Sequence, residues 1–105
     1  MKYSRLEDKM NNEQYLLLKL DEECKEVGII ANKSIQFGLD SDDNGNIPFT
    51  NKQRLFAELN DVLASIEMLN EECNLGFVPD RNAIENKKTK VKKYRNVSKE
   101  LGNVK

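Results

Sequence analysis

Two long segments of this chain place apolar residues at intervals of three and four positions, which puts them on one side of an α-helix. These stripes are Leu16, Leu20, Val27 and Ala31 in the first segment, and Leu55, Leu59, Val62, Ile66 and Leu69 in the second. No part of the sequence alternates apolar and polar residues as a half-buried β-strand does. The pattern therefore predicts an all-α fold with long helices over residues 12–38 and 50–74.

The segments around these helices are predicted from their turn-forming residues. Residues 39–50 are rich in Asp, Asn and Gly and read as a loop. Pro79 separates the second helix from a mostly polar third helix over residues 80–101. A short fourth helix over residues 1–11 is an open alternative. We expect one domain, residues 1–105, as a helical bundle of three long helices, and because so short a chain buries little surface we expect oligomerisation to complete it.

The charge is divided along the chain. Residues 1–80 carry 8 Lys/Arg and 16 Asp/Glu, whereas residues 81–105 carry 9 Lys/Arg and 2 Asp/Glu. The basic tail can fold back on the acidic body, hold an anion that a metal in the body also touches, or bind nucleic acid. Nucleic acid is the least favoured partner, because Tyr94 is the only aromatic residue near the basic positions.

Several features bear on location. No apolar run approaches the roughly 18 residues that span a bilayer, so we expect no membrane partner. Residues 1–5 lack the apolar core of a signal peptide. Two cysteines, Cys24 and Cys73, do not form a disulfide framework. The expected location is the cytoplasm.

Four carboxylates fall on or beside the apolar stripes. With Leu20 as the reference and about 100° per residue, Glu23 lies about 60° away and Glu26 about 120° away, while Glu22 points outward. With Leu55 as the reference, two acids of the second helix, Glu58 and Asp61, occupy the same two angles. Antiparallel packing of the two helices would bring all four together.

Such a group of carboxylates needs neutralisation by protons, by Lys or Arg, or by a divalent cation, because like charges a few ångströms apart cannot all stay ionised. Ligands that are all oxygen favour a hard ion, Mg²⁺ or alternatively Mn²⁺. The helical wheels alone leave open a solvated acidic face, with Lys19 paired to Glu23. A ferritin-like di-iron site is excluded because the chain has no histidine, and a structural zinc site because the two cysteines are isolated.

The loop sequence over residues 40–51 is also similar to a calcium-binding EF-hand loop, with Asp40, Asp42 and Asn44 at ligand positions. Its last position should be a bidentate Glu and is Asn51. A turn-rich loop without an ion explains the composition better.

The acidic residues resemble a known signature. Glu22-Glu23-Cys24-Lys25-Glu26 followed by Glu58-Leu59-Asn60-Asp61 is similar to the E-E-x-x-E … E-x-x-D motif of MazG-like nucleotide pyrophosphohydrolases, in the all-α NTP pyrophosphatase superfamily. The similarity covers roughly residues 15–101. Its further segments, which resemble small phage-type members, are Lys33–Gly38, Thr50-Asn51 with Arg54-Leu55, Asp61–Ala64 and Lys88–Tyr94. The spacing between the two acid motifs is longer than the family pattern because of the 39–50 loop.

The resemblance implies Mg²⁺-dependent hydrolysis of a (deoxy)nucleoside triphosphate to the monophosphate and pyrophosphate by a homodimer or homotetramer. It implies metal ligation, and a catalytic role, for Glu23, Glu26, Glu58 and Asp61, with Glu22 as a further catalytic acid at the motif's first position. Basic and aromatic residues are the candidates for binding the phosphates: Lys33, Arg54, Lys90, Lys93, Tyr94 and Arg95. The alternatives are a non-catalytic nucleotide sensor of the same fold and an interaction module that uses the basic C-terminal helix.

Overall fold

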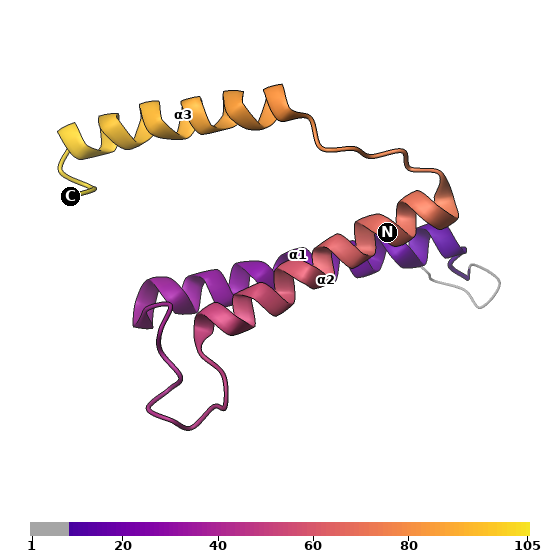
Figure 1. Ribbon diagram of the computed structural model, residues 1–105, viewed down its shortest axis with the longest axis horizontal. Coiled ribbons are helices and arrows are strands. Elements are labelled where there is room, and N and C mark those ends of the chain that lie inside the picture. Colours follow the sequence, from indigo (N-terminus) through magenta and orange to yellow (C-terminus); the bar gives the residue numbers. More distant parts are fainter. Residues whose placement is uncertain (1–8) are drawn as a thin grey trace.

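The computed structural model describes residues 9–105, and these form three α-helices. The helices are α1 (Asn12–Phe37), α2 (Asn51–Cys73) and α3 (Arg81–Glu100), as Figure 1 shows. The all-α class and the three long helices are thus confirmed, with ends within about one residue of the predicted ones. Of the short helix left open over residues 1–11, residues 1–8 lie outside the described part, and residues 9–11 are not helical.

Both helices of the pair begin at a capping box. The Asn11 side chain accepts a hydrogen bond from the Gln14 backbone N–H, and the Gln14 side chain accepts one from the Asn11 backbone. Thr50 and Gln53 make the same reciprocal pair at the start of α2. These contacts satisfy backbone donors that the first turn of a helix leaves free. Helix α1 ends at Gly38, whose φ of 93° suits a residue without a Cβ.

Helices α1 and α2 pack side by side as an antiparallel hairpin (Figure 1). The buried apolar residues of the described chain are Leu16 and Ile30 from α1 and Leu69 from α2. Far from the connecting loop, the Asn12 side chain donates a hydrogen bond of 3.1 Å to Glu72. This hairpin is the frame on which the predicted acidic residues are placed.

The loop between the helices is fastened at its base. The buried side chain of Asn51 donates to the carbonyl oxygen of Gly38 at 2.9 Å. The backbone N–H groups of Asn51 and Lys52 donate to the carbonyls of Ser41 and Leu39, each at 2.8 Å. The first turn of α2 therefore holds the start of the loop in place.

Helix α3 stands away from the hairpin in Figure 1, and within residues 9–105 it packs against neither α1 nor α2. It begins at Asp80, whose side chain accepts from the Ala83 backbone N–H. All of its side chains except Ser98 are exposed. The radius of gyration is 18.3 Å, whereas a compact domain of this length measures about 13 Å. Over residues 9–105, the basic tail therefore does not fold back on the acidic hairpin of the same chain.

Candidate functional site

Three of the four predicted metal ligands meet on one side of the hairpin. One carboxylate oxygen from each of Glu23, Glu58 and Asp61 lies within 4.8 Å of the other two. Glu58 and Asp61 share a side of α2 because they are three residues apart, and the antiparallel packing brings Glu23 of α1 opposite them. Glu23 and Glu58 are half-buried, and Asp61 is exposed. We refer to these three residues as the acidic cluster.

The remaining two acids of the first motif lie outside this cluster. Glu26 is exposed, one turn further along α1 than Glu23, and is not within the 4.8 Å group. Glu22 is exposed and forms an ion pair of 3.3 Å with Lys19. Lys19 thus pairs with Glu22 rather than with Glu23. None of the ion pairs among residues 9–105 involves a member of the acidic cluster.

The environment of Glu23 favours its protonated form. Burial raises the pKa of the Glu23 carboxyl, and the negative charges of Asp61 and Glu58 raise this pKa further, followed by those of Glu22 and Glu26. Burial first, and neighbouring carboxylates second, disfavour the charged form of Glu23 when no cation offsets its charge. Glu26 and Glu22 are therefore near enough to act on the cluster electrostatically.

This pKa shift has a consequence for stability. Without metal, native Glu23 holds its proton at pH values above its ordinary pKa of 4.5, where the unfolded chain has already lost it. The native state then binds more protons, so stability falls as the pH rises from about 4.5 through the raised pKa. We expect the free energy of unfolding, measured by urea titration with a chelator present, to fall over this pH range in the wild type. It should fall less in Glu23→Gln, which has no carboxyl at this position. A difference that grows in favour of the wild type with rising pH would contradict the assigned environment.

The acidic cluster fits a hard divalent cation. All three ligands offer oxygen, which Mg²⁺ and Mn²⁺ prefer. Oxygen atoms on opposite sides of an Mg²⁺ ion are about 4.2 Å apart, so a spread of up to 4.8 Å closes with small side-chain rotations. Glu26 could approach as a fourth ligand only by reorienting its exposed side chain.

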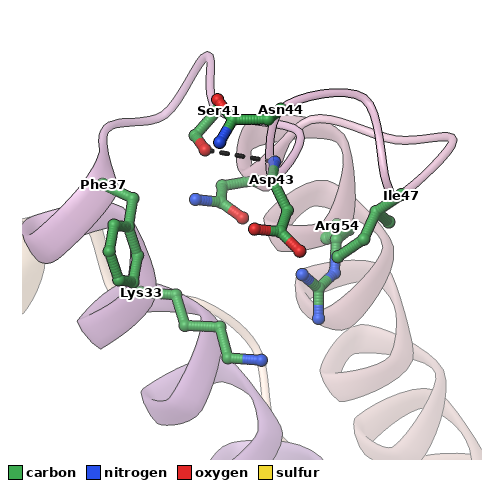
Figure 2. Close-up of a pocket in the computed structure, with 8 residues that line it drawn as sticks. Lys33, Phe37, Ser41, Asp43, Asn44, Ile47 and Arg54 are labelled. Carbon is green, nitrogen blue, oxygen red and sulfur yellow. Dashed lines mark hydrogen bonds between the residues drawn. The ribbon is translucent and has the colours of Figure 1, made fainter.

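A pocket of about 460 Å³ lies where the hairpin meets the loop. Helix α1 contributes Lys33 and Phe37, α2 contributes Arg54, and Figure 2 shows the side chains of these elements around the space. The remaining lining residues come from the loop and the first turn of α2: Ser41, Asp43, Asn44, Ile47 and Asn51. Two of the predicted phosphate-binding residues, Lys33 and Arg54, are therefore brought together here.

The pocket and the acidic cluster lie on the same two helices and share no residue. Arg54 precedes Glu58 by four residues on α2, which is one helical turn or about 6 Å. Lys33 follows Glu23 by ten residues on α1, about 15 Å along the axis. Arg54 thus lies one turn from the acids and Lys33 lies farther away, and neither makes an ion pair with them among the described residues. The hairpin offers a place for a cation and, further toward the loop, a place for an anion.

The loop acids are used differently from those of a calcium site. The Asp42 carboxylate accepts a 2.8 Å hydrogen bond from the Gly45 backbone N–H, three residues further along the loop. The only group of three or more acids found in residues 9–105 is the acidic cluster, and no loop residue belongs to it. The loop composition is accounted for by turn formation.

The predicted binding residues of the tail are not brought to the hairpin. Lys90, Tyr94 and Arg95 line a shallow groove along α3, and Lys93 lies outside it. Because α3 contacts neither α1 nor α2, these residues do not reach the acidic cluster within one chain.

Comparisons with known proteins give no relative: no protein family, curated protein or solved structure matches the chain. None of the helices in the described range, residues 9–105, is long and apolar enough to cross a membrane.

Proposed function

We propose that this chain is a Mg²⁺-dependent nucleoside-triphosphate pyrophosphohydrolase. The observation that carries the proposal is the convergence of Glu23, Glu58 and Asp61 from two helices, without a cationic partner among the described residues. Such a group is costly unless something neutralises it. The adjoining pair of Lys33 and Arg54 suits the phosphate chain of the same substrate. The E-E-x-x-E … E-x-x-D resemblance supplies the reaction type.

The proposed reaction is hydrolysis of (d)NTP by water to (d)NMP and pyrophosphate. A bound Mg²⁺ would offset the negative charge of the phosphates and of the transition state. Glu23, Glu58 and Asp61 would hold that ion, with Glu26 as a fourth ligand after reorientation. Glu22, or Glu26 if it does not ligate the ion, would take a proton from the attacking water.

The test is a panel of ribo- and deoxynucleoside triphosphates, incubated with and without Mg²⁺ and assayed for pyrophosphate release. We expect stoichiometric monophosphate and pyrophosphate only when Mg²⁺ is present. Mg²⁺-dependent nucleotide binding without turnover would overturn the enzyme and favour the sensor alternative. Binding of neither metal nor nucleotide would overturn both, and salt-dependent retention on duplex DNA would favour an interaction module.

We also propose that the working form is a homo-oligomer built on one face of the hairpin. On the helical wheel, Phe56, Leu59 and Leu63 of α2 lie about 40–100° from Leu55, on the side away from Asp61. All three are substantially exposed. In an antiparallel pair, the matching face of α1 lies on the same side, and its residues are Leu17, Cys24, Gly28 and Ile35. We call these seven residues the apolar face.

A second copy is the occupant that this face fits. The face extends about 27 Å along α1 and is about 20 Å wide, so pairing would bury about 1,100 Å² in total, near the lower limit of specific interfaces. Small residues at Cys24 and Gly28 lie at the height of the larger Phe56 and Leu59. A twofold axis parallel to the helices would place the α2 ridge of each copy over the α1 groove of the other. The acidic cluster would remain open on the far side.

A further inference from the structure

We propose that the pocket between the helix ends and the loop binds the nucleoside part of the triphosphate, with the phosphates directed toward the acidic cluster. This inference rests on the proposed function and adds the orientation of the substrate and the residues that recognise it. Phe37 of α1 and Asp43 of the loop have no role in the chemistry proposed above, and both line this pocket.

The pocket has the size and the mixed chemistry of a small-molecule site. Its volume of about 460 Å³ lies within the range of ligand sites, roughly 300–1,000 Å³. Phe37 lines it with a side chain that is 68% exposed, so its ring is free to pack against a ligand. Stacking of a nucleobase on this ring would remove both surfaces from water.

The charges in the pocket set a direction for the ligand. Lys33 and Arg54 provide cationic groups at the side nearer the acidic cluster, and Asp43 lies on the loop above them, as Figure 2 shows. A carboxylate only accepts hydrogen bonds, so Asp43 repels phosphate and suits the donors of a base or a sugar. The phosphates therefore lie toward Arg54 and Glu58, and the nucleoside lies toward Phe37 and Asp43.

The loop holds this arrangement before any ligand binds. Asp43 and Asn44 both have left-handed backbones, with φ values of 57° and 56°. The Asn46 N–H donates to the Asp43 carbonyl and the Ile47 N–H donates to the Asp42 carbonyl, each at 3.1 Å. A left-handed backbone costs free energy, and it persists here because these hydrogen bonds fix the turn. The turn fixes the position of the Asp43 backbone at the pocket.

The competing occupant is a phosphate chain alone, held by Lys33 and Arg54 without any contribution from Phe37 or Asp43. Nucleotide and inorganic tripolyphosphate share the phosphate chemistry but differ in the nucleoside. Comparing the two ligands therefore separates the nucleoside pocket from a general polyphosphate site.

The experiment is calorimetric titration of the full chain, in Mg²⁺, with an α,β-non-hydrolysable triphosphate analogue and with tripolyphosphate. The test variants are Phe37→Leu and Asp43→Asn. The second keeps the fold because Asn tolerates a left-handed backbone nearly as well as Asp. The matched controls are Phe49→Leu and Asp40→Asn, which alter exposed residues of the same loop that do not line the pocket.

Each test variant should bind the nucleotide about ten-fold more weakly, because it loses stacking or a hydrogen bond, and should bind tripolyphosphate as the wild type does. Both controls should match the wild type with both ligands. Comparing ribose and deoxyribose analogues shows whether the Asp43 effect comes from the sugar. Unchanged nucleotide affinity in both test variants, or equal losses for nucleotide and tripolyphosphate, would overturn the inference.

The outcome is separable from that of the proposed function. If the wild type hydrolyses triphosphates but the test variants behave like the controls, the nucleoside pocket is wrong and the hydrolase stands. If no pyrophosphate is released but nucleotide binding still depends on Phe37 and Asp43, the pocket stands and the hydrolase is wrong.

Discussion

Replacing Glu58 by Gln is expected to reduce triphosphate turnover by at least about 100-fold, which corresponds to about 2.7 kcal/mol of transition-state stabilisation. Glu58 is half-buried in the acidic cluster, and its oxygen lies within 4.8 Å of oxygens from Glu23 and Asp61. The amide of Gln preserves the shape of the side chain but removes the negative charge that a hard cation requires. The measurement is the rate of Mg²⁺-dependent pyrophosphate release under saturating metal.

The same variant should be at least as resistant to heat as the wild type when metal is removed. Glu58 is one of the charges that raise the pKa of Glu23, so its neutralisation relieves repulsion in the empty cluster. With Mg²⁺ present, the wild type should gain thermal stability and the variant should gain less. A variant that is stable without metal but gains less from Mg²⁺ has lost a metal ligand and has kept its fold.

Glu67→Gln is the matched control for Glu58→Gln. Glu67 is an exposed acid on the same helix, and it does not belong to the acidic cluster. Its replacement should leave both the turnover and the Mg²⁺-dependent gain in stability unchanged. Wild-type turnover in Glu58→Gln would overturn the hydrolase assignment, because the acidic cluster would then not be needed for the reaction.

The sequence predicted the helices well because their ends are determined locally. Thr50 with Gln53, and Gly38 after the first apolar stripe, are short-range signals that act within one turn. Glu23, Glu58 and Asp61 were likewise predictable as neighbours, because helical angle and antiparallel packing together determine which side chains meet. The exposed position of Glu22 also agrees with its angle on the wheel.

The loop and the tail could not be predicted to the same degree. The composition of residues 39–50 indicates turns, but the left-handed backbones of Asp43 and Asn44 depend on hydrogen bonds within the folded loop. The pocket lined by Phe37 was missed for this reason. For α3, the charge pattern was compatible with several placements of the helix relative to the rest of the chain. No local signal determines which surface a mostly polar helix contacts.

The second prediction concerns the proposed homodimer and a substitution on its apolar face. Leu63→Glu should convert a wild-type homodimer into a monomer, raising the dimer dissociation constant at least about 100-fold. Leu63 is 58% exposed in the single chain and lies near the middle of the apolar face. In a twofold dimer the substitution occurs twice, so two carboxylates would be buried without partners. Sedimentation velocity at micromolar concentration measures the change.

Met68→Glu separates this effect from a general effect of adding an acid to α2. Met68 is also exposed and apolar, but it lies about 140° from Leu55 on the opposite side of the wheel from Leu63. This control should remain dimeric, and both variants should keep wild-type helicity by circular dichroism. If the wild type is itself monomeric, or if Leu63→Glu leaves the dimer intact, the apolar face is not the interface. Loss of the dimer should also remove the dependence of the melting temperature on protein concentration, because a monomer melts at the same temperature at every concentration.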